Sequence, residues 1–284
     1  MSSRTKIEWV IRDDGKPGST LNFAYGCTNN CYYCYAKKLV KRFPEVYPLG
    51  FGNPVCDVDQ MESKIKALDT SKVAQTIFVG SMTDLFTNSF RMQKNHIDID
   101  IGKEYRMGQK VAWMFNKQTE ERLANGKKPH RYIFLTKGPG EYRTKELPKL
   151  DNFWYGATIE SNCRQTTRNS LFELLNLQKQ GYNTFVSFEP MLEFDSSYHM
   201  MALSEINWLI VGALTEGGHV NFMGIAMADA VQKMYEINPR LFVKDSIVDN
   251  INQDNLSATT FSTLTRKSIY NKIEGMRYIP WRQI

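Results

Sequence analysis

Seven short apolar runs, separated by longer polar or amphipathic stretches, constrain the fold of this chain more than any other feature. The runs are LNFAYG (21–26), TIFVGS (76–81), RYIFLTK (131–137), FWYGAT (153–158), TFVSFEP (184–190), NWLIVGA (207–213) and RLFVKD (240–245). Helices are expected between them, at 34–43, 103–124, 167–181 and 223–238. Near-continuous apolar strands that alternate with helices predict a parallel sheet built from βα units, and therefore an α/β fold.

The residues at the ends of these strands favour a full or partial (β/α) TIM-type barrel over a doubly wound sheet. Chemically capable side chains follow nearly every run: Cys27, Ser81, Asp84, Thr136, Lys137, Thr158, Glu160, Ser161, Ser187, Glu189, Glu216 and Lys244. In a barrel the carboxyl ends of all strands open on one face, whereas a doubly wound sheet uses those near its switch point. We expect a single barrel domain over residues 1–284, with a long irregular insertion, rich in Gly and Pro, at about 43–75.

Composition limits the class of protein. The sequence has no apolar run approaching the roughly 18 residues of a membrane span, and its N-terminus has no apolar signal segment. An odd number of cysteines, five, argues against a disulfide framework and favours a reducing cytoplasm. The net charge of +6 is modest, but basic residues gather at 36–42, 125–131 and 142–149. Such runs are usually solvated faces, and a surface for phosphate backbones is the alternative.

Three of the five cysteines lie within eight positions, in GCTNNCYYCYA, and are spaced C-x3-C-x2-C. A structural zinc site needs a fourth ligand, and neither Cys56, Cys163 nor any histidine stands at knuckle spacing. An idle thiol cluster is another alternative. Three thiolates also suit a [4Fe–4S] cluster whose fourth iron has no protein ligand and stays open to a substrate or cofactor. The spacing therefore predicts that Cys27, Cys31 and Cys34 are metal ligands.

This motif, with an aromatic residue before its last cysteine, resembles the signature of the radical SAM superfamily. Other stretches resemble a radical-SAM-like family common in phages and mobile elements: TKIEW (5–9), FVGSMTDLF (78–86), FLTKGP (134–139), WYGATIES (154–161), FVSFEPML (185–192), WLIVGALTEGG (208–218) and FVK (242–244). Together they cover most of the chain in order. TD (83–84) and TK (136–137) resemble spore photoproduct lyase more distantly.

The resemblance implies a mechanism and its cofactors. S-adenosylmethionine (SAM) would bind the open iron of a [4Fe–4S] cluster and be cleaved reductively to a 5′-deoxyadenosyl radical, which abstracts hydrogen from a substrate. An electron donor such as flavodoxin or ferredoxin is implied as well. A nucleobase, nucleotide or nucleic acid is the favoured substrate class, and a peptide or small metabolite is the second. The third hypothesis is a non-catalytic Fe–S or zinc module that binds nucleic acid.

The resemblance also implies a role for residues near the first three strand ends. Tyr33 would lie near the adenine of SAM. Ser81, Thr83 and Asp84 follow the strand that binds the methionyl amino group, and a carboxylate there suits an ammonium. An ST or Asx turn is the alternative for these three residues.

Residues of the middle strands are expected to contact other parts of SAM. Lys137 or Arg168 would meet the methionyl carboxylate, with a surface salt bridge as the alternative. Thr158, Glu160 and Ser161 would contact the ribose hydroxyls, although Glu160 also suits a helix cap.

The last strands supply the remaining candidates. Glu189 and Lys244, with Ser187, are expected to reach SAM or the substrate, and a buried Glu–Lys pair is the alternative. Gly212 would let the backbone approach the adenine, unless it forms a plain turn. Cys163 is a candidate to return a hydrogen atom to the substrate radical, although an inert thiol is the more common case.

Overall fold

The computed structural model describes residues 3–94, 97–99, 106–142, 144–162, 164–214, 224–253 and 275–282. Two compact units divide the chain, Met1–Tyr155 and Gly156–Ile284. The boundary between the units falls inside a strand, β9 (Phe153–Ser161). The prediction of a single domain stays a prediction.

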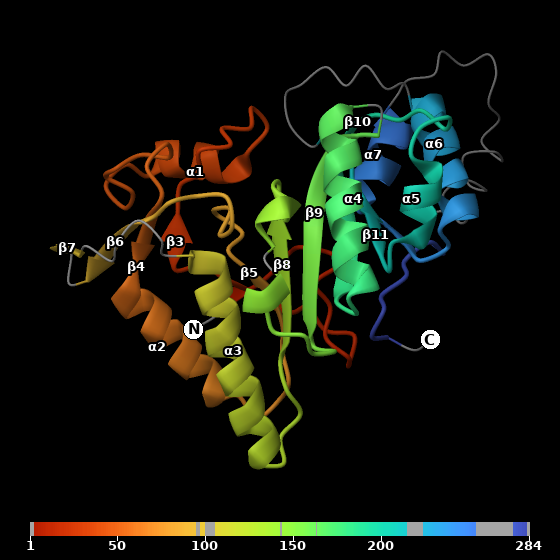
Figure 1. Ribbon diagram of the computed structural model, residues 1–284. Coiled ribbons are helices and arrows are strands. Elements are labelled where there is room, and N and C mark those ends of the chain that lie inside the picture. The colour runs from red at the N-terminus through yellow and green to blue at the C-terminus, as the bar shows by residue number, and fades with distance from the viewer. Residues whose placement is uncertain are drawn as a thin grey trace. The chain divides into compact units, whose positions relative to one another are not determined.

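Within the described residues, the larger sheet has eight strands in the order β1-β2-β5-β8-β9-β10-β11-β12 (Figure 1). Besides β9 they are β1 (Ser3–Arg4), β2 (Ser19–Leu21), β5 (Thr76–Val79), β8 (Arg131–Thr136), β10 (Asn183–Glu193), β11 (Leu209–Val211) and β12 (Leu241–Val243). In the first unit β5 pairs in parallel with β2 and β8, and in the second unit β11 pairs in parallel with β10 and β12. The predicted α/β fold, a partial TIM-type barrel, is confirmed.

The first unit contains the helices α1 (Tyr35–Arg42), α2 (Val58–Asp69), α3 (Met107–Ala124) and the short 3-10 helices η1 (Pro139–Glu141) and η2 (Thr144–Glu146). The second contains α4 (Gln165–Lys179), α5 (Met200–Glu205), α6 (Gly224–Ile237) and α7 (Asp245–Gln253). Four helices, α1, α3, α4 and α6, lie where the sequence predicts them, and α2, α5 and α7 were not predicted. None of the helices in the described ranges has the length and apolar character needed to cross a bilayer.

The apolar run at 21–26 does not form one strand but is divided between two sheets. Leu21, at the end of β2, accepts a hydrogen bond from Gly80 N in the larger sheet (2.9 Å). Two residues later the carbonyl of Phe23 accepts from Asp57 N (3.0 Å), so the chain has already turned toward the smaller sheet. The first run therefore ends in the smaller sheet, and the cysteines follow a strand of that sheet.

The smaller sheet has the order β3-β4-β6-β7 within the described residues. Its strands are β3 (Ala24–Tyr25), β4 (Val55–Asp57), β6 (Arg91–Lys94) and β7 (Ile97–Ile99). β4 and α2 both fall inside the insertion expected at about 43–75, while residues 43–54 contain neither helix nor strand. The insertion thus supplies β4, the inner strand that pairs with β3, from which the cysteine loop emerges.

Aromatic packing fixes α3 and the loop after β5 against β8. Phe115 of α3 stacks on Tyr132 of β8 with ring centroids 4.3 Å apart, and both side chains are fully buried. Phe86, in the loop after β5, meets Phe134 of β8 edge to face at 5.9 Å. Burying rings of this size contributes strongly to stability, and the edge-to-face contact also favours one relative orientation of the two rings. The loop after β5 is therefore held firmly beside the end of β8.

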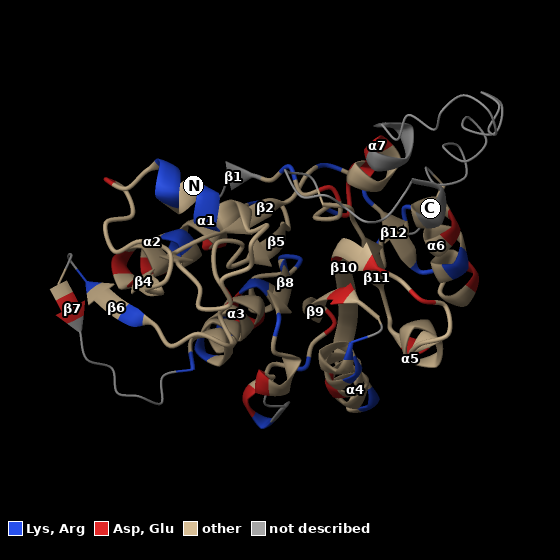
Figure 2. Cartoon of the chain, turned by 90° about the horizontal axis from the view of Figure 1, so that it is seen from above, with Lys and Arg blue, Asp and Glu red and all other residues tan. Residues whose placement is uncertain are grey.

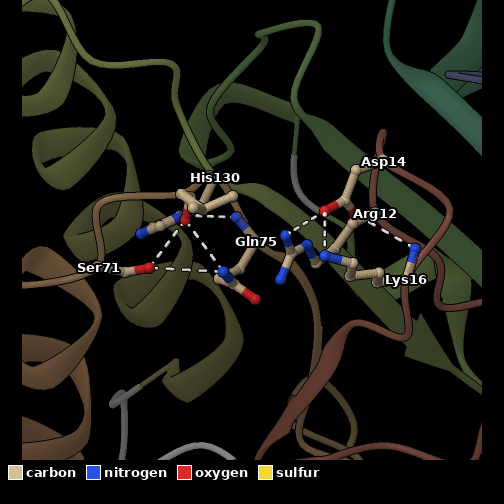
Figure 3. A network of polar contacts seen from close by, with 7 residues as sticks. Arg12, Asp14, Lys16, Ser71, Gln75 and His130 are labelled. Carbon is tan, nitrogen blue, oxygen red and sulfur yellow. Dashed lines mark hydrogen bonds and ion pairs between the residues drawn. The ribbon is translucent and has the colours of Figure 1, made fainter.

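A buried histidine joins the start of β5 to the end of α2. Gln75 N donates to Nδ1 of His130 (2.9 Å), so Nε2 carries the proton and donates to the carbonyl of Leu68 (3.1 Å). Figure 3 shows the contact between Gln75 and His130, together with the ion pair of Arg12 and Asp14. Burial, assisted by the charge of Arg122, lowers the pKa of His130 from 6.5 to about 4. The imidazole is accordingly neutral at pH 7.

We expect the pH dependence of stability to report this histidine. Because its pKa is lower in the folded state, the unfolded chain takes up the proton first, and stability falls as the pH drops from about 6.5 toward 4. The loss is about 3 kcal/mol, since one pKa unit corresponds to about 1.4 kcal/mol. Urea denaturation at a series of pH values measures it. His130→Gln should flatten the curve in this range, and His199→Gln, in the second unit, should leave it unchanged.

Candidate functional site

The cysteine loop, residues 26–34, joins β3 to α1 and carries all three cysteines of the motif. Cys27, Cys31 and Cys34 are free thiols, and each residue is half-buried. Gly26 starts the loop at a φ of +87°, and a Cβ there would lie 2.9 Å from two backbone oxygens of the segment before β4. Glycine is therefore required at this position, because any larger residue would push the loop away from that segment.

The loop ends in a turn that starts α1. The carbonyl of Cys31 accepts from Cys34 N (3.3 Å), and the carbonyl of Cys34 accepts from Lys38 N (3.4 Å). Cys34 is the N-cap residue of α1 and has an extended backbone. The position of the third thiol is thus set by the start of the helix.

Asn88, in the loop after β5, ties down the first part of the cysteine loop. Its side-chain oxygen accepts from both the backbone N (2.9 Å) and the hydroxyl (2.6 Å) of Thr28. Its amide nitrogen donates to Cys27 Sγ (3.3 Å) and to the carbonyl of Asp84 (2.8 Å). Since the residue is buried, these four contacts use most of the bonding capacity of its amide.

The carboxylate of Asp84 joins three segments of the first unit. Within its own loop it accepts from the backbone N of Phe86 (3.1 Å) and of Thr87 (3.2 Å), which is an Asx turn. From the end of β8 it accepts from the hydroxyl of Thr136 (2.8 and 2.9 Å) and from Lys137 N (2.9 Å).

The third segment joined by Asp84 is the cysteine loop, where Asn29 Nδ2 donates to Oδ2 of Asp84 (3.2 Å). The side chain of Asp84 is buried, with 6% of its surface exposed. Both oxygens are therefore engaged by donors of the chain itself. The turn that the sequence leaves open as an alternative is present, and the proposed contact of Asp84 with a methionyl amino group stays a prediction.

Ser81 and Thr83, two further candidates after β5, are also bonded to neighbouring segments. The hydroxyl of Ser81 bonds to the side chain of Asn22 (2.9 Å) and accepts from Tyr35 Oη (2.8 Å). Thr83 Oγ1 donates to the carbonyl of Gly26 (2.5 Å), at the start of the cysteine loop. Every polar residue predicted after β5 therefore contacts the cysteine loop or its flanks.

Tyr33 and Lys137 lie together beside the loop. Lys137 Nζ donates to Tyr33 Oη (2.5 Å) and lies 5.2 Å from the centroid of the tyrosine ring. The strand end of β8 thereby brings a cation to the aromatic residue of the motif. Both residues were predicted from the sequence, and the structure brings them together.

The three thiols suit an iron–sulfur cluster by their chemistry, although no metal geometry is preformed. Among the described residues, no group of three or more His, Cys, Asp or Glu side chains is arranged to hold a metal ion. Thiolates are nevertheless the ligands that these clusters use, and all three are unpaired by disulfides on one short loop. Burial raises the pKa of the Cys27 thiol, and the hydrogen bond from Asn88 opposes that rise. Ligand binding and loop closure would therefore be coupled.

In the second unit, candidates from the middle of β10 and from the residues directly after β11 and β12 converge. Lys244 Nζ forms an ion pair with Glu189 Oε1, and Ser187 Oγ lies 3.5 Å from the other carboxylate oxygen of that residue. A Cβ on Gly212 would lie 2.9 Å from Lys244 Cδ and 3.1 Å from Glu189 Cδ. Glycine thus makes room for the pair, whose side chains remain partly exposed (16% for Lys244 and 28% for Glu189).

The other candidates of the second unit that the structure describes lie on β9 and α4. Ser161 donates to Glu193 Oε2 (2.8 Å), and Glu160 lies 3.8 Å from Arg164. Thr158 is half-buried on β9, and Arg168 is exposed on α4. Their proposed contacts with SAM stay predictions.

Two sequence candidates cannot be placed. Cys163 lies outside the described residues, as does Glu216 after β11. Their predicted roles are untested.

Sequence reasoning missed Asn88 and Asn29. Asn88 follows Asp84 by four positions in the same polar loop, which is the one local signal it has. Its partner Cys27 is 61 positions away, so no local pattern identifies the contact. Asn29 is one of two adjacent asparagines between cysteines and looks like an ordinary loop residue.

Comparison with known proteins gives one family and a set of distant structures. The model of the family described as "Protein of unknown function (DUF5131)" matches residues 4–234. No curated protein matches the chain. A variant of spore photoproduct lyase is similar in structure with a TM-score of 0.47 and 10% identity, covering 99% of this chain and 78% of that one.

Two further variants of the same enzyme are similar to a comparable degree. One has a TM-score of 0.45 and 10% identity, over 97% of this chain and 75% of that chain. The other, solved with a dinucleoside spore photoproduct, has a TM-score of 0.46 and 9% identity over the same shares. Likeness at this level assigns no residue role, so roles must come from the contacts of the chain itself.

Replacing Asp84 tests its structural role. Asp84→Asn leaves one acceptor oxygen where two are used, so the buried hydroxyl of Thr136, the half-buried Lys137 N or Asn29 Nδ2 loses its acceptor. We expect the free energy of unfolding to fall by about 3 kcal/mol. Glu62→Gln, at an exposed position of α2, is the control and should change it by less than about 0.5 kcal/mol. If Asp84→Asn and the wild type were equally stable in urea denaturation, the structural role of Asp84 would be contradicted.

Cys56 of β4 should behave as an inert thiol. Burial, with the nearby charge of Asp57, raises the pKa of Cys56 to about 12, and reactivity requires the thiolate. Iodoacetamide at pH 8 should therefore label the half-exposed Cys31 and Cys34 in the native protein and reach Cys56 after denaturation. Peptide mass spectrometry measures the order, and native labelling of Cys56 at the rate of Cys31 would contradict it.

Proposed function

We propose that this chain, which belongs to the family described as "Protein of unknown function (DUF5131)", is a radical SAM enzyme. Cys27, Cys31 and Cys34 would hold a [4Fe–4S] cluster. The observation that carries the proposal is the set of three free thiols in C-x3-C-x2-C spacing on one loop, bonded through its neighbours to the ends of β5 and β8. A partial barrel whose strand ends meet a cysteine loop is an architecture that places a cofactor at those ends.

The number of thiols supports this chemistry over a structural zinc site. Zinc takes four protein ligands in a closed structural site, and the fourth cysteine of the described chain, Cys56, is buried in β4. When bound, the cluster and SAM would supply the electron and the sulfonium whose reductive cleavage yields a hydrogen-abstracting radical. The protein itself contributes binding, orientation and exclusion of water.

Asn88 and Asp84 act in this proposal as positioning residues. Asn88 holds Thr28 and donates to Cys27 Sγ, so it orients the first thiol and stabilises its charged form. Asp84 anchors the cysteine loop by accepting from Asn29, and it also accepts from Lys137 N at the end of β8. Neither would need to touch SAM to matter for cluster binding.

Lys137 and Tyr33 are proposed to meet SAM. Lys137 brings a positive charge beside the loop, where a methionyl carboxylate would replace its contact with the phenol oxygen. A charged acceptor makes a stronger hydrogen bond than a neutral one, so this exchange is favourable. The ring of Tyr33 offers a surface against which an adenine can pack.

In the second unit, Glu189, Gly212 and Lys244 are proposed to bind SAM or substrate. The pair presents both charge signs beside a glycine that admits a close approach of the backbone. A ligand with a carboxylate or a hydroxyl could replace Glu189 or Lys244 in the ion pair, at the energetic cost of separating these two side chains. Thr158, Glu160, Ser161 and Arg168 complete the proposed contacts on β9 and α4.

The substrate is proposed to be a nucleobase or nucleic acid. The basic stretches of the sequence support this choice, because they supply the charges that phosphates require. A peptide or a small metabolite is the alternative substrate class, and a non-catalytic Fe–S or zinc module is the alternative to an enzyme. Flavodoxin or ferredoxin is the proposed electron donor.

Anaerobic reconstitution with iron and sulfide tests the proposal. With SAM and dithionite, the wild type should release 5′-deoxyadenosine, measured by liquid chromatography and mass spectrometry. Cys31→Ala should lose both the cluster absorbance and this product, because one iron loses its thiolate. Cys56→Ala removes a cysteine from the same unit and should retain both.

Three results would reject the enzyme. A wild type that binds a cluster yet releases no 5′-deoxyadenosine would support the non-catalytic module. Binding of one zinc ion in place of iron and sulfide would reject the cluster. Retention of the cluster in Cys31→Ala would show that the motif is not its ligand set.

A further inference from the structure

The packing of α1 fixes which of its faces is exposed. Ala36 and Val40, one helical turn apart, are buried and form a small apolar cluster with Met82. Because residues at i and i+4 share a face, the opposite face of α1 must point away from that cluster. The helix cannot rotate without exposing both residues.

Positive charge occupies that outer face. Lys38, Lys41 and Arg42 are exposed, and Lys37 lies half-buried at the flank, where its Nζ donates to Asn30 Oδ1 (2.6 Å). Figure 2 shows α1 coloured for Lys and Arg along its length. Over residues 34–54 the sequence contains these four basic residues and one acidic residue, Glu45. The face is therefore strongly cationic.

Part of this charge does not serve the stability of the helix, although Lys41 and Arg42 lie in the last turn, where the helix dipole favours positive charge. Lys37 and Lys38 lie in the first turn, where the helix dipole favours negative charge, and that turn contains no acidic residue. The spacing of Lys37 to Lys41, and of Lys38 to Arg42, places like charges at i and i+4, which is unfavourable. The two first-turn lysines and the like-charge pairs are therefore not explained by helix stability, and they suit an anionic partner.

Exposed aromatic rings flank the basic face at both ends. Tyr32, in the cysteine loop, is 64% exposed, and Tyr35, at the start of α1, is 54% exposed. Phe43 follows the helix with 36% exposed, and the guanidinium of Arg42 lies 5.4 Å from its ring centroid. Aromatic rings beside cations are the combination that binds unpaired bases by stacking while the cations meet phosphates.

We propose that the α1 surface, formed by Tyr32, Tyr35, Lys38, Lys41, Arg42 and Phe43, binds single-stranded nucleic acid. The helix is about 12 Å long, which spans two or three phosphates of an extended strand. The surface begins inside the cysteine loop, so a bound strand runs directly past the three thiols. Binding by this surface stands by itself, and the identity of the strand as substrate rests on the proposed function.

Single strands are favoured over duplexes because stacking requires unpaired bases. A duplex would meet the cations through its phosphates and leave the rings of Tyr32 and Phe43 without a partner. An acidic protein would also bind through its charges and would make little use of the aromatic rings. The aromatic residues therefore distinguish the proposed partner from other polyanions.

Fluorescence anisotropy with a fluorescein-labelled oligothymidylate of about 20 nucleotides tests the surface, using the anaerobically reconstituted full chain at several KCl concentrations. Combined Lys38→Gln, Lys41→Gln and Arg42→Gln should weaken binding about tenfold or more near 0.1 M KCl. The slope of log Kd against log salt should fall by about 2, since each phosphate contact to a single strand contributes about 0.7.

Matched variants separate this surface from net charge. Combined Lys66→Gln, Lys72→Gln and Lys117→Gln remove three exposed charges elsewhere in the first unit, outside the basic stretches, and should keep the wild-type slope. Tyr32→Ala should weaken oligothymidylate binding about fivefold or more and leave binding of an oligothymidylate–oligoadenylate duplex unchanged. Urea denaturation of each variant confirms that it is folded.

Two outcomes would overturn the proposal. If the α1 triple variant and its control lose affinity equally, the binding reflects net charge and not this surface. If the duplex binds as tightly as the single strand and Tyr32→Ala changes neither, the partner is not single-stranded. Release of 5′-deoxyadenosine is followed in parallel, so that failure of SAM cleavage with intact binding rejects the proposed enzyme and leaves the surface in place.

Discussion

The buried carboxylate of Asp84 is the interaction on which the candidate site depends. It accepts hydrogen bonds from its own loop, from the end of β8 and from the cysteine loop, so three segments distant in sequence share one acceptor. Burying a carboxylate is unfavourable unless donors surround it, and here both oxygens have them. Local geometry around the cysteines is thus a consequence of a polar junction and not of apolar packing alone.

The cysteine loop is anchored at its start, at its centre through Asn29, and at its end. Gly26 and Thr83 fix its start, Asn88 holds Cys27 and Thr28, and Cys34 begins α1. Metal sites of small loops are commonly completed by the metal, because thiolates in the absence of a cation repel one another and lose their solvation. An anchored loop reduces the entropy lost when a cluster binds.

The two units contribute different chemistry. The first combines thiols with a cation, Lys137, beside an aromatic ring, and its α1 carries an exposed positive face. The second brings Glu189, Gly212 and Lys244 together, because the parallel register pairs Phe188 with Val211 and Val211 with Val243, so the residues that follow lie side by side. The cysteine loop is followed directly by α1 and its basic face. The proposed cluster and the proposed anionic partner would therefore bind to neighbouring segments of the chain.

The sequence by itself determined the alternation of strands and helices, the parallel character of the sheet and the identity of the three candidate thiols. These follow from local periodicity and from spacing within a few residues, which a single chain displays directly. Two pairs of sequence candidates are in contact: Tyr33 with Lys137, which the sequence did not predict, and Glu189 with Lys244, which it left open as an alternative.

Tertiary structure alone decided the rest. It divided the first apolar run between β2 and β3, recruited Asn88 and Asn29 as anchors, and engaged Asp84 with donors of the chain itself. It also turned the basic residues of α1 outward by burying Ala36 and Val40. The physical reason is that these outcomes depend on partners tens of positions away, which no local pattern encodes, and a buried polar group takes its role from whichever partners folding brings to it.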